Sequence, residues 1–412
     1  MKILWVKAGK LLPVDSGGKI RSFNLLRELA ARHETALLSY YPGDPDAEYD
    51  ERIRSVIADT VTVPYRAPST GMGTALHYAA RFPSAVPYAV SKFTSPAARR
   101  LIQQWMVQNR FDVMVCDFLS ATLTFPARLS TPTALFQHNV ESALWARQAL
   151  HERDPIKRAV YRIEAYRMDR YEHQAVERFH HVIAVSESDR VLMSRMTDAS
   201  RITVAPTGVD VSRYREAQNA EADEPIVLFL GSMDWEANVD GVEFFHQNIW
   251  PRIRDAVPNA TFRIVGRNPS ARVRRLCDDP SVQVTGAVPD VVAHLREAAV
   301  FVVPLRIGGG TRLKIYEAMA AGRAVVSTTV GAEGLDFENG RDLIVADTPE
   351  SFANSVVALL RDRAYRQAVA HAAAERSADF DWSAVVTHFE NSLRCTIEAA
   401  GAAVPRRHAD AL

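Results

Sequence analysis

Short apolar runs alternate with amphipathic helical stretches along nearly all of the 412 residues. In the first half, residues 3–6 and 35–41 are typical of buried strands, and residues 19–32 between them place leucines along one face of a helix. Parallel strands need long crossover connections, which are usually helices. The alternation therefore predicts βαβ units, parallel sheets and an α/β fold class.

The alternation is interrupted once, by a polar and acidic connector at 216–224, and restarts with the apolar run 226–230. A chain of this length exceeds one ordinary domain. We predict an N-terminal α/β domain over 1–205, a C-terminal one over 206–380, and a C-terminal helix plus tail over 381–412. Residues 143–178 are charged and helical in pattern, and Pro155 is expected to break or kink that helix.

The composition excludes several classes of protein. Forty-nine basic and 49 acidic residues give a formal net charge of zero, which argues against a general polyanion binder, and no nucleic-acid motif is present. Three dispersed cysteines exclude a disulfide scaffold or a cysteine zinc site, and we expect them to be small core side chains. No apolar run approaches the roughly 18 residues of a membrane span, and the run at 3–6 is too short for a signal peptide. These features predict a cytoplasmic protein.

The most informative segment joins an apolar run to a helical stretch through three consecutive glycines, Gly308, Gly309 and Gly310. Glycines let backbone N–H groups approach a ligand closely, and the start of a helix carries positive potential. An anion site is therefore favoured over the alternative, a tight turn with no ligand.

Charged side chains follow these glycines at once. Thr311 and Arg312 begin the helical stretch, Lys314 adds a second cation, and Glu317 lies one turn further on. The cations suit a diphosphate, and the glutamate is placed to accept hydrogen bonds from sugar hydroxyls.

In this segment the chain resembles the glycosyltransferase family 4 group of retaining GT-B enzymes, most closely a branch linked with bacterial exopolysaccharide assembly. The resemblance extends to Gly231 and Ser232 after a predicted strand, to Arg267, and to residues 327–334. It implies two Rossmann-like, doubly wound domains facing a central cleft, with a nucleotide-sugar donor held mainly by the C-terminal domain. It also implies that the C-terminal helix packs back on the N-terminal domain, and that transfer retains the anomeric configuration without a metal.

Two departures from the family pattern stand out. Of its two glutamates eight positions apart, Glu317 matches the second, which implies a ribose contact, but Gly309 occupies the place of the first. The arginine and lysine that usually hold the diphosphate fall on Ser232 and Ala237. Our hypothesis is that Arg312 and Lys314 replace them from another loop.

The N-terminal half contributes a second group of candidates. Gly17 and Gly18 lie between the first predicted strand and its helix, and resemble the family's N-terminal glycine loop. His138 follows the predicted strand 133–137, at the edge where α/β sites gather, and resembles the family's cleft histidine. We predict His138 and Glu317 as catalytic-site residues. No strong base is required, because the leaving diphosphate can accept the acceptor's proton.

Asp44 and Asp46 imitate a metal-binding Asp-x-Asp pair, but a solvated turn is predicted there, with no metal and no other cofactor.

Residues 60–111 contain no acidic residue and interleave basic with aromatic side chains. This composition suits peripheral contact with the inner membrane face or a lipid-diphosphate acceptor. The alternative is an ordinary arginine-rich surface with the aromatic residues in the core.

The resulting prediction is a retaining glycosyltransferase that moves a sugar from a nucleotide-diphosphate sugar to a saccharide or lipid-linked acceptor. The alternatives are a non-catalytic GT-B-like subunit and a GT-B nucleotide-sugar 2-epimerase. The zero net charge is a cancellation, because residues 1–205 carry 27 basic and 21 acidic side chains and residues 206–412 carry 22 and 28. The first half is therefore expected to meet an anionic surface.

Overall fold

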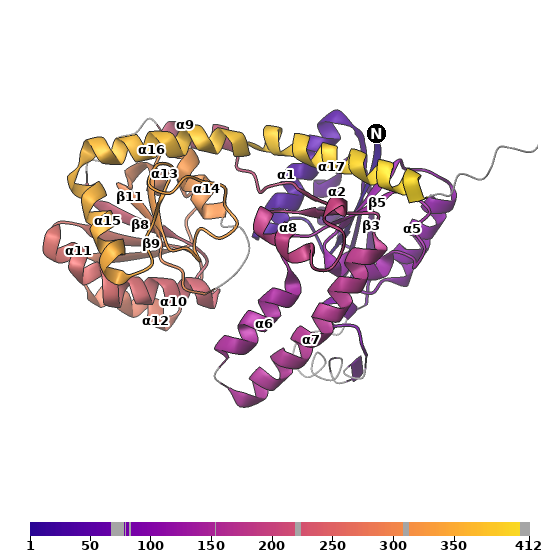
Figure 1. Ribbon diagram of the computed structural model, residues 1–412, viewed down its shortest axis with the longest axis horizontal. Helices are drawn as coiled ribbons and strands as arrows, with labels where there is room; N and C mark the ends of the chain where they lie inside the picture. The colour runs from indigo at the N-terminus through magenta and orange to yellow at the C-terminus, as the bar shows by residue number, and fades with distance from the viewer. Residues whose placement is uncertain are drawn as a thin grey trace, which may run out of the picture. The chain divides into compact units, whose positions relative to one another are not determined.

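The computed structural model describes residues 1–66, 78, 80–81, 84–152, 154–218, 224–307 and 313–403. The chain forms two compact units, the first made of Met1–Pro206 with Val385–Leu412 and the second of Thr207–Ala384 (Figure 1). Each unit holds one parallel sheet with helices on its faces. The predicted fold class, α/β with two Rossmann-like domains, is confirmed.

The sheet of the first unit has seven parallel strands in the order β3-β2-β1-β4-β5-β6-β7. Its strands are β1 (Lys2–Ala8), β2 (Glu34–Pro42), β3 (Asp59–Tyr65), β4 (Val113–Asp117), β5 (Thr133–Phe136), β6 (His181–Ala184) and β7 (Ile202–Val204). The strand order reverses at β1, which pairs with both β2 and β4. Ligands of such sheets bind at the carboxyl ends of the strands beside this reversal. Lys7 and Asp117 are register partners at that place.

The helices of the first unit are α1 (Gly17–Arg32), α2 (Ala47–Arg54), α4 (Tyr88–Ser91), α5 (Pro96–Val107), α6 (Glu141–His151), α7 (Pro155–Arg178) and α8 (Glu187–Met193), with short 3₁₀ turns at Leu119–Thr124 and Ala199–Arg201. The helical stretch predicted over 143–178 is interrupted before Pro155, as expected, because α6 ends at His151 and α7 begins at Pro155. Asp154 caps α7 by accepting hydrogen bonds from the next backbone N–H groups, and Pro155 occupies the first turn, where no N–H is needed. Helices α6 and α7 lie side by side as an antiparallel hairpin that extends away from the sheet of this unit (Figure 1).

The sheet of the second unit has six parallel strands in the order β10-β9-β8-β11-β12-β13. Its strands are β8 (Ile226–Leu230), β9 (Thr261–Val265), β10 (Val282–Gly286), β11 (Val300–Val303), β12 (Ala324–Ser327) and β13 (Ile344–Val345). The order reverses between β8 and β11. The loops that follow these two strands are therefore the expected ligand loops of this unit.

The helices of the second unit are α9 (Val211–Gln218), α10 (Glu236–Phe244), α11 (Trp250–Ala256), α12 (Ala271–Arg274), α13 (Val292–Glu297), α14 (Leu313–Ala320), α15 (Pro349–Arg361) and α16 (Arg363–Ser377). Helices α10 and α11 are joined by a π-helical turn at Phe245–Ile249. Pro251, in the first turn of α11, cannot donate the backbone hydrogen bond that a continuous helix requires, and the wider turn accommodates it.

Each unit has its own hydrophobic core. The last helix, α17 (Trp382–Ala403), joins the core of the first unit through Phe389, whose ring stacks 5.4 Å from that of Trp5. Beside it, Glu390 lies 3.1 Å from His33 at the end of α1. Among the cysteines, Cys116 is buried and Cys395 is half-buried, but Cys277 is exposed, so the expected core role is wrong for Cys277.

Candidate functional site

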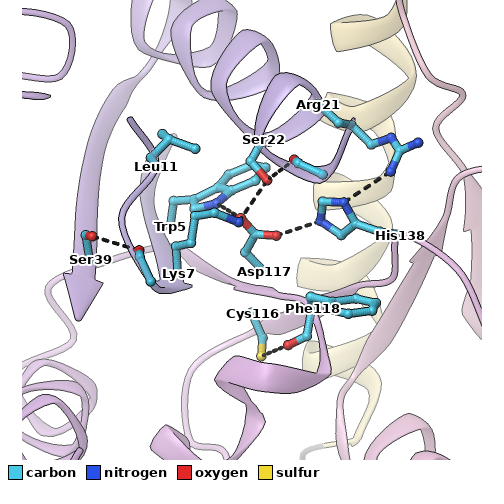
Figure 2. Close-up of polar contacts among 12 residues, drawn as sticks. Trp5, Lys7, Leu11, Arg21, Ser22, Ser39, Cys116, Asp117, Phe118 and His138 are labelled. Carbon is cyan, nitrogen blue, oxygen red and sulfur yellow. Dashed lines mark hydrogen bonds and ion pairs between the residues drawn. The ribbon is translucent and has the colours of Figure 1, made fainter. Parts of the chain in front are cut away.

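A buried carboxylate organises the first unit at the reversal of strand order. Asp117, the last residue of β4, is 1% exposed and accepts three hydrogen bonds, which Figure 2 shows together with their surroundings. The donors are Trp5 Nε1 at 2.9 Å, Lys7 Nζ at 2.8 Å and His138 Nε2 at 2.7 Å. Burial alone would raise the pKa of Asp117, but the charge of Lys7 and the hydrogen bonds outweigh it and hold that pKa well below its usual range. Asp117 is therefore an anion at neutral pH.

The two neighbours of the His138 ring define its tautomer. Nδ1 lies 3.1 Å from Nη1 of Arg21, a buried residue of α1. A guanidinium only donates, so Nδ1 accepts, and the ring proton sits on Nε2, which donates to Asp117. Burial lowers the pKa of His138 to about 4; Asp117 opposes this shift, and Arg21 and Lys7 reinforce it. The ring is thus neutral and fixed at pH 7, with both nitrogens occupied.

The backbone next to Asp117 is strained. Phe118 has a φ of 76° and a ψ of 166°, a region populated almost only by glycine. Its ring lies 5.2 Å from the His138 ring, edge to face. Such strain costs about 1–3 kcal/mol and clusters at functional sites, so it marks the neighbourhood of His138 independently of its charges.

The N-terminal glycine pair and His138, predicted separately, lie together in the structure. Gly17 is the exposed first residue of α1, and a Cβ added to Gly18 would lie 3.4 Å from Nδ1 of His138. Ser22 links Gly18 to Lys7, because it donates to the Gly18 carbonyl at 2.9 Å and accepts from Lys7 at 3.3 Å. Lys7 and His138 both donate to Asp117. Glycine at position 18 therefore leaves the approach to the histidine open.

A second buried carboxylate supports the loop that carries His138, and sequence reasoning missed it. Glu172 of α7 accepts from Gln137 Nε2 at 3.0 Å, from the backbone N–H groups of Glu141 and Ser142 at 3.0 Å, and from Ser142 Oγ at 2.6 Å. Burial, reinforced by the charge of Glu172, raises the pKa of Glu141 to about 7. The β5–α6 loop is thus anchored on both sides of the histidine.

In the second unit, Lys314 reaches the loop that follows β8. Its Nζ lies 2.9 Å from Oδ1 of Asn238 and 4.3 Å from the ring centre of Phe229. A Cβ added to Gly231 would lie 2.7 Å from the same nitrogen. Glycine at 231 therefore leaves room for the ammonium group, beside the position where Ser232 replaces the expected cation.

Ser232 and Arg267, two donor-site candidates, lie together in the structure. Arg267 Nε donates to Ser232 Oγ at 3.0 Å and lies 3.8 Å from the carboxylate of Asp234. Ser232 in turn donates to Asp234. The loops after β8 and β9 are closely packed, since a Cβ on Gly266 would lie 1.7 Å from the Gly231 carbonyl oxygen. The two strand ends thus form one surface.

Glu317 lies on α14, one turn beyond Lys314, and is partly buried. Burial raises its pKa, although a hydrogen bond from the Tyr214 hydroxyl and the charges of Arg213 and Lys314 oppose the shift. Tyr214, from α9, was not anticipated from the sequence. The five remaining candidates of this loop, Gly308, Gly309, Gly310, Thr311 and Arg312, lie outside the described residues.

The stretch 60–111 separates its two kinds of side chain. Trp105 and Phe111 are 6% and 7% exposed and belong to the core, whereas Arg99 and Arg100 on α5 are exposed. This arrangement agrees with the alternative in which the aromatic residues are core residues, and the membrane contact stays a prediction. Over the part of the chain that the structure covers, no helix combines the length and apolarity needed to cross a bilayer.

In the Asp-x-Asp pair formed by Asp44 and Asp46, Asp46 caps α2 and pairs with Lys10.

Two Rossmann-like domains, each with one parallel sheet, are the architecture of the GT-B glycosyltransferases. A Glycosyltransferase Family 4 profile matches residues 16–213, and a Glycosyl transferases group 1 profile matches residues 224–362. The chain therefore belongs to the family 4 glycosyltransferases.

Individual relatives are distant. The phosphatidyl-myo-inositol mannosyltransferase of Mycolicibacterium smegmatis is 28% identical over 213 residues, which are 49% of this chain and 54% of that protein, so the chain spans about half of that relative's length. Its counterpart in Mycobacterium leprae is 25% identical over 71% of this chain and 76% of that protein. The crystal structure of Anabaena HepE in complex with UDP and glucose superposes with a TM-score of 0.63 at 14% identity, covering 96% of this chain and 99% of that one. This last likeness concerns the fold.

Proposed function

We propose that the chain transfers a sugar from a nucleotide-diphosphate sugar to a saccharide or lipid-linked acceptor, with retention of configuration and without a metal. The observation that carries the proposal is the position of Lys314, which brings a cation to the β8 loop where the family's usual cations are replaced. In this proposal Lys314 and Arg267 bind the diphosphate, Glu317 binds the ribose, and Gly231 and Ser232 line the donor site. The Gly308–Gly310 loop with Thr311 and Arg312 completes it.

The relatives support the two substrates. The mycobacterial proteins are named for mannosyl transfer to a phosphatidylinositol lipid, which favours a lipid-linked acceptor, and the Anabaena protein holds UDP and glucose. Nucleotide sugars are cytoplasmic metabolites, so the proposed setting is the cytoplasm, where the acceptor is extended during exopolysaccharide assembly.

The chemistry assigned to the first unit is binding and positioning. His138 is neutral with both nitrogens engaged, so it offers a fixed polar ring to the donor sugar and takes no proton at neutral pH. The acceptor's proton passes to the leaving diphosphate, whose developing charge Lys314 stabilises. Gly17 and Gly18 keep the approach to the ring open.

Donor binding tests this proposal directly. Calorimetric titration with UDP, GDP and ADP and with their sugar conjugates names the base and the sugar. Lys314→Ala is expected to weaken binding of the best ligand at least tenfold, and Glu317→Gln several-fold for ligands that contain ribose. The matched control is Arg252→Ala, which removes an exposed cation of α11 in the same unit. Unchanged affinity in Lys314→Ala contradicts the diphosphate role.

Product analysis separates the alternatives. Incubation of the donor without acceptor yields an epimerised nucleotide sugar from a 2-epimerase, which needs no acceptor. Incubation with a lipid-linked saccharide yields an extended product only from a transferase. A non-catalytic subunit gives neither product and no hydrolysis of the donor.

A further inference from the structure

The outer face of α7 exposes apolar side chains in a helical stripe. Ile156, Ile163 and Tyr166 are 76%, 39% and 63% exposed, and their spacing of seven and then three residues places them on one face of the helix. On α6, Leu150 is 77% exposed, close to the carboxyl end of that helix. A continuous apolar face of this kind marks a contact surface for another molecule.

A surface pocket opens along the same stripe. It has a volume of about 560 Å³ and lies between Val86 and α7, where Ile163 and Tyr166 contribute apolar surface. Volumes of 300–1,000 Å³ are typical of small-ligand sites. Arg162 and Arg170 line the pocket as well, and none of the described residues that line it is acidic.

The arginines at this pocket have little to neutralise them. Glu164, two residues from Arg162, is buried and already accepts from Arg167 at 2.9 Å and from the Tyr88 N–H at 3.1 Å. Asp169, the residue before Arg170, lies 3.7 Å from His173. Arg170 donates to the Tyr166 hydroxyl at 3.3 Å, and within the described ranges neither Arg162 nor Arg170 has a carboxylate partner. Two guanidinium groups thus border an apolar pocket, with no carboxylate within 4.0 Å of either among the described residues.

We propose that this pocket binds the phosphate-bearing end of an amphipathic lipid. Arg162 and Arg170 would each donate a pair of hydrogen bonds to the phosphate oxygens, a geometry that guanidinium groups favour. The hydrocarbon would run along Ile163 and Tyr166 toward the exposed side chains at the end of the hairpin. That this lipid is the carrier of the sugar acceptor rests on the proposed function; the binding itself does not.

The probe is dihexanoyl phosphatidic acid, kept below its micellar concentration and titrated calorimetrically into the full chain without nucleotide sugar. Saturable binding is expected, with glycerol 3-phosphate and octyl glucoside each at least tenfold weaker, because they carry only the head or only the chain. Glycerol 3-phosphate binding as tightly as the lipid would identify a plain phosphate site and overturn the proposal. Absence of saturable lipid binding would overturn it as well.

Variants locate the site. Arg162→Gln/Arg170→Gln and Ile163→Ser/Tyr166→Ser are each expected to weaken lipid binding at least tenfold, and because these side chains lie at the surface the chain should remain folded. The matched controls, Val191→Ser for an exposed apolar residue of α8 and the double variant R99Q/R100Q for an exposed basic pair of α5, are expected to bind as the wild type does. Loss in R99Q/R100Q with retention in R162Q/R170Q would move the lipid contact to α5 and refute the pocket. UDP-sugar titration of the same samples reports on the second unit, so a lost lipid site and a failed donor proposal give different results.

Discussion

Removing the Arg21 guanidinium should raise the pKa of His138, and removing the Asp117 carboxylate should lower it. Arg21 Nη1 lies 3.1 Å from Nδ1, so its charge opposes protonation of the ring, whereas Asp117 at 2.7 Å favours it. Unit charges about 4 Å apart at an effective dielectric constant of about 20 interact by about 4 kcal/mol, equivalent to about 3 pH units. Water that enters beside a shortened side chain screens much of this. We therefore expect Arg21→Met to raise the pKa of His138 by about 1 unit.

The assay is NMR of the full chain labelled at histidine Cε1, with the His138 signal assigned by its loss in His138→Gln. The wild-type signal should show no midpoint between pH 5 and 8, because burial holds the pKa at about 4. Arg21→Met should bring a midpoint to about pH 5, and Asp117→Asn should move it further out of range. Arg27→Met, which removes a more exposed charge of the same helix, is the control and should change nothing.

A wild-type midpoint near pH 6.5, or an Arg21→Met signal that does not move, would refute the assigned tautomer and the neutral ring.

The lowered pKa of His138 also predicts how the stability of the first unit depends on pH. His138 binds a proton near pH 6.5 in the unfolded chain and only near pH 4 in the folded chain. The neutral ring therefore makes its full contribution to the free energy of unfolding above pH 6.5. About 3 kcal/mol is lost as the pH falls from 6.5 to 4.

Three further substitutions test other parts of the two clusters. Phe118→Gly should be about 1 kcal/mol more stable than Phe118→Ala in thermal unfolding, the reverse of the usual order, because only glycine relaxes at a φ of 76°. The free energy of unfolding of Glu141→Gln, measured in urea, should exceed that of the wild type by about 2 kcal/mol between pH 5 and 7. The reason is that the raised pKa of Glu141 makes its ionisation in the folded wild type costly in that range. Gly231→Ala should weaken donor binding by displacing the Lys314 ammonium group, with a small loss of stability, which calorimetry and thermal unfolding measure together.

The strands were predictable because buried parallel strands are short, continuous apolar runs. β8 begins and ends with the apolar run 226–230 of the sequence. The helix α5 was not given bounds, although the alternative for 60–111, an arginine-rich surface with aromatic residues in the core, describes its exposed Arg99 and Arg100 and its buried Trp105. The spacing of residues along a helix distinguishes its buried face from its exposed face only when each residue is assigned to one of the two faces.

The candidate site was predicted less completely, for a physical reason. His138 was found because it follows an apolar run. Lys7, next to last in β1, and Asp117, last in β4, also follow apolar runs but were missed. Their role depends on β1 and β4 being neighbours, with Lys7 and Asp117 in register although 110 residues separate them. Strand order is a tertiary property, and the usable signal is a charged residue at the end of an otherwise apolar strand. Applied to β1 and β4, that rule would have identified both residues.

Folding sharpens the charge asymmetry of the chain. Among the described residues of 1–205, the buried charged side chains are three acids and two bases, namely Asp117, Glu164, Glu172, Lys7 and Arg21. Burial therefore removes more negative than positive charge from the surface, and the positive excess counted in the sequence remains there. Buried charges of opposite sign cancel one another locally. The net charge at the surface therefore determines the long-range attraction of anions, which dissolved salt weakens with distance. The guanidinium groups of Arg162 and Arg170 thus lie on the unit that carries the positive excess, so an anionic amphiphile would be drawn to that unit before the pocket recognises it.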